Sequence, residues 1–152
     1  MKPIFKETGA AFLLLISLAL LNCNCTNSNK GASAYQQMIK DYYAAYEKKD
    51  WTLMEPILAT GFTFTSPAGD DHINLDVYKQ RCWPNANKTK RFDLEKIMID
   101  GDVAYVTYNG WTTDDKLFRN TEIFKFKDGK IISNECFFGT GVSFPNNTNA
   151  GK

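Results

Sequence analysis

The second half of the sequence alternates between apolar and polar residues and is interrupted by two Asp-Gly pairs. Asp100-Gly101 and Asp128-Gly129 lie between runs with this alternation, at Phe92–Ile99, Val103–Thr112, Leu117–Lys127 and Lys130–Gly139. A period of two is typical of β-strands, and Asp-Gly between two such runs is a strong signal for a tight hairpin turn. The sequence therefore predicts an antiparallel sheet from about residue 92 onward.

The segment before this sheet is expected to be mainly helical. Apolar residues recur at spacings of three and four at Met38, Ile39, Tyr42, Ala45 and Tyr46. This spacing predicts an amphipathic helix with one apolar face.

Two further helices and one strand are expected between this helix and the sheet. A short helix is predicted at Trp51–Leu58, and another at Leu75–Cys82, where Asn74 can cap the start and Pro84 ends the run. Phe62–Ser66 alternates and stops at a Pro-Ala-Gly turn, which predicts a strand. Helices followed by an antiparallel sheet indicate an α+β domain.

The amino terminus has the layout of a bacterial export signal. A short basic start is followed by the apolar run Gly9–Leu21, which is too short for a typical membrane-spanning helix. The run ends at Leu20-Leu21-Asn22-Cys23, which resembles a lipobox despite the unusual Asn22. We expect residues 1–22 to be a signal peptide and Cys23 to be acylated, which would place the protein at a bacterial membrane, periplasmic or on the cell surface. Cys25 is a second candidate for acylation, and a plain secretory signal is the alternative.

The rest of the chain divides into three parts. Residues 23–33 are small and polar and are expected to form a tether, residues 34–144 a single domain, and residues 145–152 a flexible tail. Cleavage before Cys23 leaves 18 − 2 = 16 basic and 17 − 1 = 16 acidic residues. A net charge of zero argues against a nucleic-acid partner, so we expect membrane contact through the lipid anchor only.

The cysteines and the histidine limit the chemistry of the domain. Cys82 and Cys136 can form a disulfide after export or stay as free thiols, and the sequence leaves both open. With His72 as the only histidine, no metal-ligand set of recognised spacing can be assembled. We expect no metal and no other cofactor.

One predicted strand places a carboxylate among buried side chains. Asn120, Glu122, Phe124 and Phe126 share the face of the strand that carries two phenylalanines. Because an uncompensated buried charge is costly, Glu122 requires polar partners or a ligand. It either lines a ligand cavity or is a structural carboxylate bonded to Tyr42, Asn120 or Asn134.

Three motifs, in this order, resemble those of SnoaL-like and ketosteroid-isomerase-like proteins of the nuclear-transport-factor-2-like superfamily. They are DYYAAYEKKDW in the first helix, FTFTSPAG in the first strand and NTEIFKFKDGKIISNECFFG in the last hairpin. The resemblance implies a cone-shaped fold in which three N-terminal helices pack on a curved antiparallel sheet. Function does not follow from it, because the superfamily contains isomerases, cyclases, dehydratases and non-catalytic binding modules.

The isomerase comparison implies roles for particular residues. In those enzymes a tyrosine and a protonated acid form an oxyanion hole, and the matching positions here are Tyr42 and Glu122. The position of the base is Ser66, whose hydroxyl is not a base near neutral pH without a partner. Steroid isomerisation is therefore not expected. His72, with Asp70 and Asp71 beside it, is a candidate substitute base or part of a solvated loop.

Three functions are consistent with these features. The first is an exported domain that binds a small, largely apolar ligand in the cone, through Tyr42, Tyr46, Ser66, Trp83, Trp111, Asn120, Glu122, Asn134 and Phe138. The second is an isomerase, cyclase or dehydratase that uses Tyr42 and Glu122 as oxyanion donors, with His72 or Asp70 as the catalytic base. The third is a non-catalytic interaction subunit, a homodimer among the possibilities, with Thr63, Thr65, Thr121 and Ile123 at or near the interface.

Overall fold

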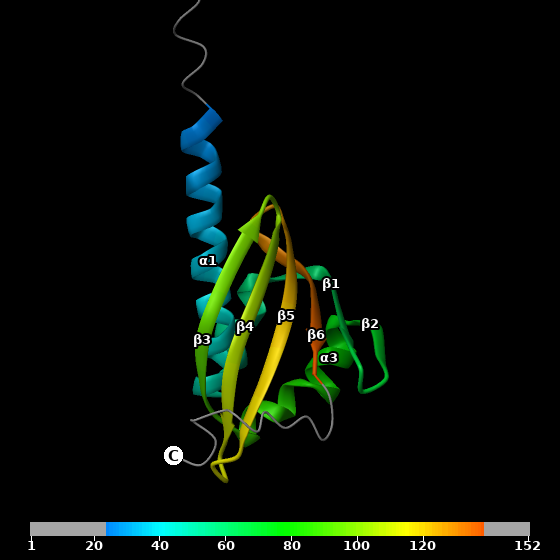
Figure 1. Ribbon diagram of the computed structural model, residues 1–152. Coiled ribbons are helices and arrows are strands. Elements are labelled where there is room, and N and C mark those ends of the chain that lie inside the picture. Colours follow the sequence, from blue (N-terminus) through cyan, green and yellow to red (C-terminus); the bar gives the residue numbers. More distant parts are fainter. Residues whose placement is uncertain (1–23, 139–152) are drawn as a thin grey trace, which may run out of the picture.

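Six strands form a single sheet in the order β2-β1-β6-β5-β4-β3 (Figure 1). The computed structural model describes residues 24–138. The strands are β1 (Leu58–Ser66), β2 (Asp70–Asn74), β3 (Thr89–Asp100), β4 (Val103–Thr112), β5 (Leu117–Lys127) and β6 (Lys130–Phe137). The helical elements are α1 (Asn24–Lys48), α2 (Trp51–Met54), η1 (Glu55–Ile57), α3 (Leu75–Arg81) and η2 (Trp83–Lys88). The α+β architecture predicted from the sequence is confirmed.

The four long runs of the second half form the predicted hairpins. Strands β3 to β6 pair antiparallel with their neighbours. At the last turn Asp128 and Gly129 both have positive φ, of 50° and 70°, which is the conformation that a type I′ hairpin turn requires. The prediction of a wholly antiparallel sheet is wrong at one place, because β1 pairs with β6 in parallel.

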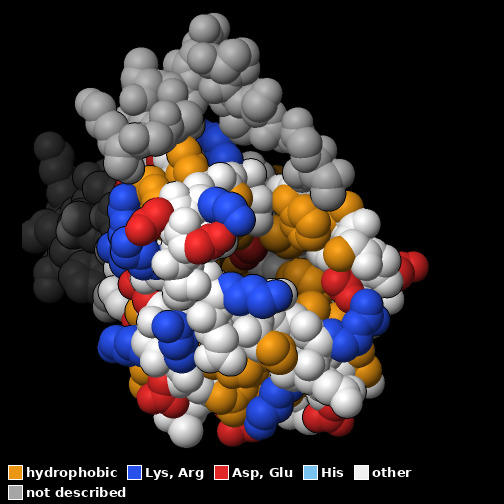
Figure 2. Space-filling view, turned by 90° about the horizontal axis from the view of Figure 1, so that it is seen from below, with side chains coloured by type: hydrophobic (Ala, Val, Ile, Leu, Met, Phe, Trp, Pro, Cys, Tyr) orange, Lys and Arg blue, Asp and Glu red, His pale blue; other side chains and the backbone are white. Residues whose placement is uncertain are grey.

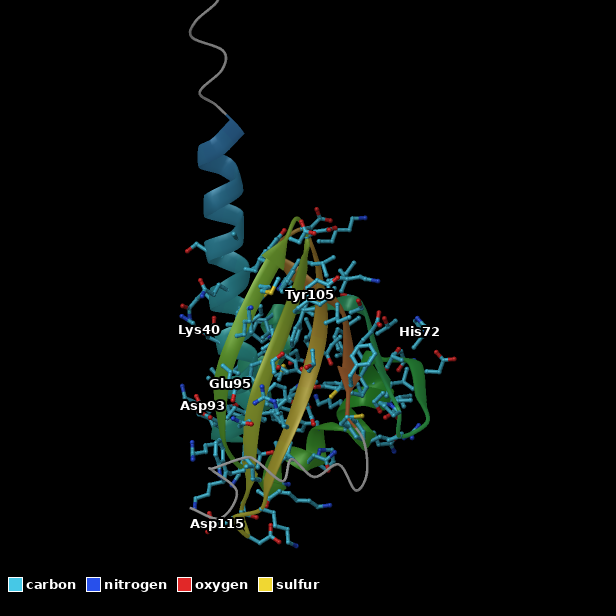
Figure 3. All side chains as sticks on the ribbon, viewed as in Figure 1. Lys40, His72, Asp93, Glu95, Tyr105 and Asp115 are labelled. Carbon is cyan, nitrogen blue, oxygen red and sulfur yellow. The ribbon has the colours of Figure 1, made fainter. Side chains whose placement is uncertain are left out.

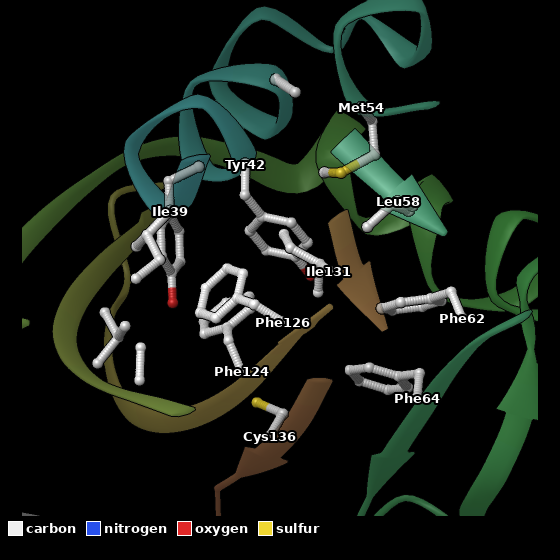
Figure 4. Packing of buried hydrophobic residues seen from close by; sticks show 14 of the residues in the cluster. Ile39, Tyr42, Met54, Leu58, Phe62, Phe64, Phe124, Phe126, Ile131 and Cys136 are labelled. Atoms are coloured by element: carbon white, nitrogen blue, oxygen red, sulfur yellow. The ribbon is translucent and has the colours of Figure 1, made fainter. Parts of the chain in front are cut away.

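Helix α1 packs on the concave face of the sheet and closes one side of the core. Tyr42 meets Phe124 of β5 edge to face, with ring centroids 5.1 Å apart, and Figure 4 shows Tyr42 directed toward Phe124 and Phe126. Phe62 and Tyr78 are fully buried on the side where β1 meets α3. Large aromatic side chains therefore fill the space that the curved sheet encloses.

Some elements differ from the sequence predictions. The run predicted as one helix at Trp51–Leu58 is the four-residue α2 followed by a 3₁₀ turn, because Pro56 has no N–H to continue the helical hydrogen bonding. Strand β2 was not predicted, since its sequence DDHIN has only one large apolar residue. Asn74 caps α3 as expected, and its Oδ1 accepts a hydrogen bond from the backbone N–H of Val77 at 3.0 Å.

The segment expected to be a tether is helical. Helix α1 begins at Asn24 and extends past the edge of the sheet (Figure 1), because no proline interrupts the chain before the amphipathic part. The predicted signal peptide, Cys23 and the tail 145–152 lie outside the described residues. Between Asn24 and Phe138, no helix is both long and apolar enough to cross a membrane.

Candidate ligand-binding site

A cavity of about 430 Å³ opens between α1, η2 and the concave face of the sheet. Figure 2 looks into its open end, where a hollow bordered by hydrophobic side chains contains an acidic side chain. Its walls are mainly aromatic, and the polar groups are few. The lining residues that carry the argument below are Tyr42, Tyr43, Tyr46, Ser66, Asp70, Tyr108, Asn120 and Glu122.

Glu122 is buried on β5 and accepts three hydrogen bonds. Tyr108 of β4 donates to Oε1 at 2.7 Å, while Tyr43 of α1 and the amide of Asn134 of β6 each donate to Oε2 at 3.0 Å. Asn120 in turn donates to the hydroxyl oxygen of Tyr108 at 3.1 Å. The carboxylate thus joins three elements and has a donor for each oxygen.

The protonation of Glu122 reflects a balance between burial and these donors. Burial raises the pKa of Glu122 above its ordinary value, and the hydrogen bonds from Tyr108, Asn134 and Tyr43 oppose part of that rise. Burial also holds the pKa of Tyr43 and of Tyr108 well above the usual value for a phenol. Both phenols therefore stay protonated, and each donates a hydrogen bond to Glu122.

Three tyrosine hydroxyls form a chain beside the cavity. The hydroxyl of Tyr78 on α3 lies 2.7 Å from that of Tyr42 and 2.6 Å from that of Tyr46. Burial raises the pKa of all three, so each keeps its proton. Two of the three protons are used in the bonds to Tyr78, and the third remains for a further acceptor, either the hydroxyl at the other end of the chain or a group in the cavity. Tyr42 and Tyr46, the two ends of the chain, line the cavity.

Ser66 and Asp70 form the third polar group in the cavity. The Ser66 hydroxyl donates to Asp70 Oδ2 at 2.7 Å and accepts the backbone N–H of Ala68 at 3.2 Å. Arg81 Nη2 lies 3.0 Å from Asp70 Oδ1 and forms an ion pair with it. The turn between β1 and β2 thus carries a carboxylate next to the position where the isomerases have their base.

Two thiols also line the cavity. Cys82 and Cys136 are free, which answers the question that the sequence left open. Burial raises the pKa of Cys82 to about 11 and that of Cys136 well above its ordinary value. Both thiols are therefore protonated near neutral pH and are poor nucleophiles. Within residues 24–138 no group of His, Cys, Asp or Glu side chains is arranged to hold a metal ion.

A family model described as a SnoaL-like domain matches residues 39–134. The chain belongs to the SnoaL-like domain family. The match covers α1 from Ile39, most of the cavity lining and β6 as far as Asn134.

Solved structures support the same fold for this SnoaL-like domain. An NTF2-like protein from Cytophaga hutchinsonii is 17% identical with a TM-score of 0.56, over 68% of this chain and 88% of that one. A putative polyketide cyclase from Sinorhizobium meliloti is 21% identical with a TM-score of 0.55, over 66% and 94%. A putative ketosteroid isomerase from Kribbella flavida is 15% identical with a TM-score of 0.62, over 74% and 83%. No curated protein is significantly similar to the chain in sequence.

Most residues predicted to line the cavity of the SnoaL-like domain do so. Tyr42, Tyr46, Ser66, Asn120, Glu122 and Phe138 all lie in its wall. Asn134 is fully buried behind the wall and acts through Glu122. The predicted partnership of Tyr42 with Glu122 is wrong, because Tyr42 bonds to Tyr78 and the neighbouring Tyr43 bonds to Glu122.

Three other predicted site residues lie outside the cavity wall. Trp83 packs between Tyr46 and Trp51, and Trp111 stacks under Arg91, whose guanidinium carbon is 3.4 Å from the ring centroid. His72 is exposed and contacts Asp71, and Figure 3 shows it at the outer edge of the molecule. Its backbone has a positive φ of 51°. His72 is therefore wrong as a catalytic candidate in this cavity.

Three residues that shape the cavity of the SnoaL-like domain were missed from the sequence. Tyr43, Tyr78 and Tyr108 make the hydrogen bonds described above. Asp70, named as a possible base, lies in the wall and accepts the Ser66 hydroxyl. Tyr108 follows Ala104 and Val106 on the buried face of β4, so strand alternation was a signal that could have found it. Tyr78 had no such signal, because its position depends on how α3 packs against β1.

Proposed function

We propose that this domain binds a small, largely apolar molecule that carries a hydrogen-bond acceptor, such as a carbonyl oxygen. The observation that carries the proposal is the tyrosine chain, whose end residues Tyr42 and Tyr46 line the cavity and have one proton that the bonds to Tyr78 do not use. A hydrogen bond of this kind contributes about 0.5–1.5 kcal/mol. A ligand acceptor at Tyr42 or Tyr46 would form it.

The remainder of the cavity suits an apolar body. Phe64, Phe92 and Phe118 form much of the wall, and the volume of about 430 Å³ lies within the range of small-molecule sites. Both carboxylate oxygens of Glu122 already accept hydrogen bonds from the protein, so Glu122 offers a ligand few further polar contacts. The ligand that fits is apolar over most of its surface.

An enzyme of the isomerase, cyclase or dehydratase type is the alternative, and one observation favours it. Burial raises the pKa of Glu122, which favours the neutral acid that an oxyanion hole uses. Neighbours of the fold include proteins named as a putative cyclase and a putative isomerase. Against this role, Tyr42 and Glu122 each bond to other tyrosines and do not form a joint site.

Native mass spectrometry of the purified domain tests the proposal. We expect a co-purified small molecule on the wild type, and less of it on a variant in which Tyr42 and Tyr46 are both changed to Phe. Tyr105→Phe is the matched control, because that tyrosine is exposed and does not line the cavity. The proposal fails if no molecule is retained from a cell extract, or if the double variant retains as much as the control.

The fate of a retained molecule separates binding from catalysis. The extracted molecule is incubated with fresh domain and then analysed for a change of mass or structure. If the molecule is recovered unchanged, the result supports a binding module. Conversion that Glu122→Gln abolishes, in a variant that still binds the molecule, supports the enzyme.

We also propose that the domain is exported and held at a membrane by a lipid on Cys23. The charged start, the apolar run Gly9–Leu21 and the lipobox-like Leu20–Cys23 support this. The mass of the mature amino terminus, with and without Cys23→Ala, is the test. We expect a lipid-sized mass that Cys23→Ala removes, and an unmodified mature terminus would contradict the proposal.

A further inference from the structure

The 3₁₀ helix η2 contributes a row of side chains to the cavity wall. Cys82, directly before η2, and Asn85 and Lys88 within it all line the cavity, at intervals of three residues. A 3₁₀ helix has about three residues per turn, so residues at this spacing lie on one face. Cys82 is partly buried, whereas Asn85 and Lys88 are exposed. The row therefore runs from the interior of the cavity to its rim.

Hydrogen bonds fix the backbone of this row. The N–H of Asn85 donates to the carbonyl of Cys82 at 3.1 Å, and the carbonyl of Asn85 accepts the Thr89 hydroxyl at 3.0 Å. The carbonyl of Lys88 accepts the N–H of Thr113, which follows β4, at 2.9 Å. The two exposed side chains therefore start from fixed positions at the rim.

The side chains of Asn85 and Lys88 are both available to a ligand. Neither makes a side-chain hydrogen bond within residues 24–138, and Lys88 has no ion pair there. The neighbouring Lys90 differs, because it pairs with Asp115. An amide and an ammonium group, which can both donate hydrogen bonds, thus border the same opening one helical turn apart.

Lys88 carries an uncompensated charge in the cavity wall. It is the only Lys or Arg among the described residues that line the cavity. Of the two carboxyl groups in the wall, Asp70 is paired with Arg81, and Glu122 accepts three hydrogen bonds from the protein. Figure 2 shows Lys or Arg side chains beside the hollow. The rim therefore attracts an anion, and an anionic group there keeps part of its contact with water, so its desolvation costs little.

We propose that Asn85 and Lys88 form an anion site at the rim, which binds a carboxylate or a similar anionic group of the ligand. The inference rests on the proposed function and deepens it, because the ligand then has an acceptor at the tyrosine chain and an anion at the rim. Lys88 supplies the charge, and the amide of Asn85 donates to an oxygen of the same group. The class of ligand is an oxo acid with an apolar body.

The test uses two probes that differ in charge at one end. The first, 6-acetyl-2-naphthoic acid, has a ketone and a carboxyl group at opposite ends of an apolar body, and the carboxyl group is ionised at about pH 7. In 6-acetyl-2-naphthamide a neutral amide of similar size replaces the carboxylate. Their dissociation constants are measured by fluorescence titration of the purified domain at low salt. We expect the wild type to bind the acid about threefold to tenfold more tightly than the amide, the size typical of an exposed ion pair with one charged hydrogen bond.

Lys88→Gln should bring the two dissociation constants to within about twofold of each other, and Lys88→Glu should make the amide the tighter ligand. Asn85→Ala should reduce the preference in part. Lys90→Gln is the matched control, because it removes the same charge from an exposed lysine outside the cavity wall, and it should keep the preference. Circular dichroism checks that each variant is folded, and if one Lys88 variant is not, the other decides.

The outcomes separate the anion site from the proposed function. Equal binding of the two probes by the wild type, or an unchanged preference in Lys88→Gln, overturns the anion site and leaves the cavity as a ligand site. Loss of the preference in Lys90→Gln as well also overturns it, because the effect then reflects net charge alone. If neither probe binds saturably, the anion site is overturned together with the proposed function.

Discussion

The hydroxyl of Tyr43 on α1 donates a hydrogen bond to Glu122 on β5, and the two oxygens lie 3.0 Å apart. The two residues are far apart in the sequence, and the bond connects the first helix directly to the sheet through the buried interior. It also supplies part of the compensation that a buried carboxylate requires. The contact therefore links the stability of the domain to the chemistry of its cavity.

Tyr43→Phe should destabilise the domain by about 1–3 kcal/mol, because it removes a donor from a buried acid. Urea unfolding measures the change. Tyr35→Phe on the same helix is the control, since Tyr35 stacks on Phe126 and makes no side-chain hydrogen bond to a described residue. The control should change stability by less than about 0.5 kcal/mol. Equal effects of the two substitutions would show that the bond to Glu122 contributes nothing.

The raised pKa of Glu122 predicts a dependence of stability on pH. A carboxyl with a folded pKa above its unfolded value of about 4.3 binds a proton more tightly in the folded state. Its contribution to stability is fully present below that unfolded value, and it is lost as the pH rises through the folded pKa. Glu122→Gln cannot ionise, so the stability of the wild type relative to this variant should fall as the pH rises from about 4. Urea midpoints measured across this range test it, and parallel curves would contradict it.

Tyr78→Phe should break the tyrosine chain at its centre. Tyr42 and Tyr46 would both lose their partner, and we expect a loss of about 1–3 kcal/mol in the free energy of unfolding. Tyr105→Phe, at an exposed tyrosine, is the control and should have little effect. If Tyr78→Phe is as stable as that control, the hydroxyls do not depend on one another.

The sequence was sufficient for the fold and for the buried carboxylate, but not for its partners. Strand alternation placed Glu122 inside, and that is where it lies. Strand alternation does not indicate whether Tyr42 or Tyr43 is the partner of Glu122, because the two tyrosines are adjacent in the sequence and equally buried. Only the packing angle of α1 on the sheet decides which hydroxyl reaches the carboxylate.

The region around β2 was misinterpreted for a different physical reason. A residue type with a pKa near neutral drew attention to His72, whereas the buried group is Asp70. The pairing of β1 with β2 has a register shift between Phe64 and Ser66, and the backbone of His72 has a positive φ. Neither feature follows from the order of polar and apolar residues.

Gly110 of β4 predicts a way to change the cavity without removing a polar group. Gly110 pairs with Phe118 of β5, and a Cβ on Gly110 would lie 2.2 Å from the Phe118 ring. Gly110→Ala should displace that ring, which lines the cavity, with a stability loss of about 1–3 kcal/mol. Gly61→Ala on β1 is the control, because nothing lies within 4 Å of its added methyl group. The amount of co-purified molecule detected by native mass spectrometry should change in the first variant only, and equal amounts on the two variants would contradict the role of this contact.

The outer face of the sheet remains a predicted interface. Tyr105 on β4, labelled in Figure 3, pairs with Met98 on one side and with Ile123 on the other. Both Tyr105 and Met98 are exposed. Exposed apolar groups on one sheet face favour self-association. We expect the mass in light scattering to rise with concentration and Tyr105→Glu to suppress the rise. Lys40→Glu, at an exposed residue of α1, should not, and a monomer at all concentrations would contradict the prediction.

The tyrosine chain also allows the direction of its hydrogen bonds to reverse. If Tyr42 donates to Tyr78 and Tyr78 donates to Tyr46, the free proton is on Tyr46; in the opposite order it is on Tyr42. Either order uses the same atoms in the same positions, so reversal requires only rotation of the three hydroxyl groups. The end that does not hold the free proton can accept a hydrogen bond instead. The domain could thus accommodate a ligand in two opposite polarities without moving its backbone, a form of tolerance that a single fixed donor does not provide.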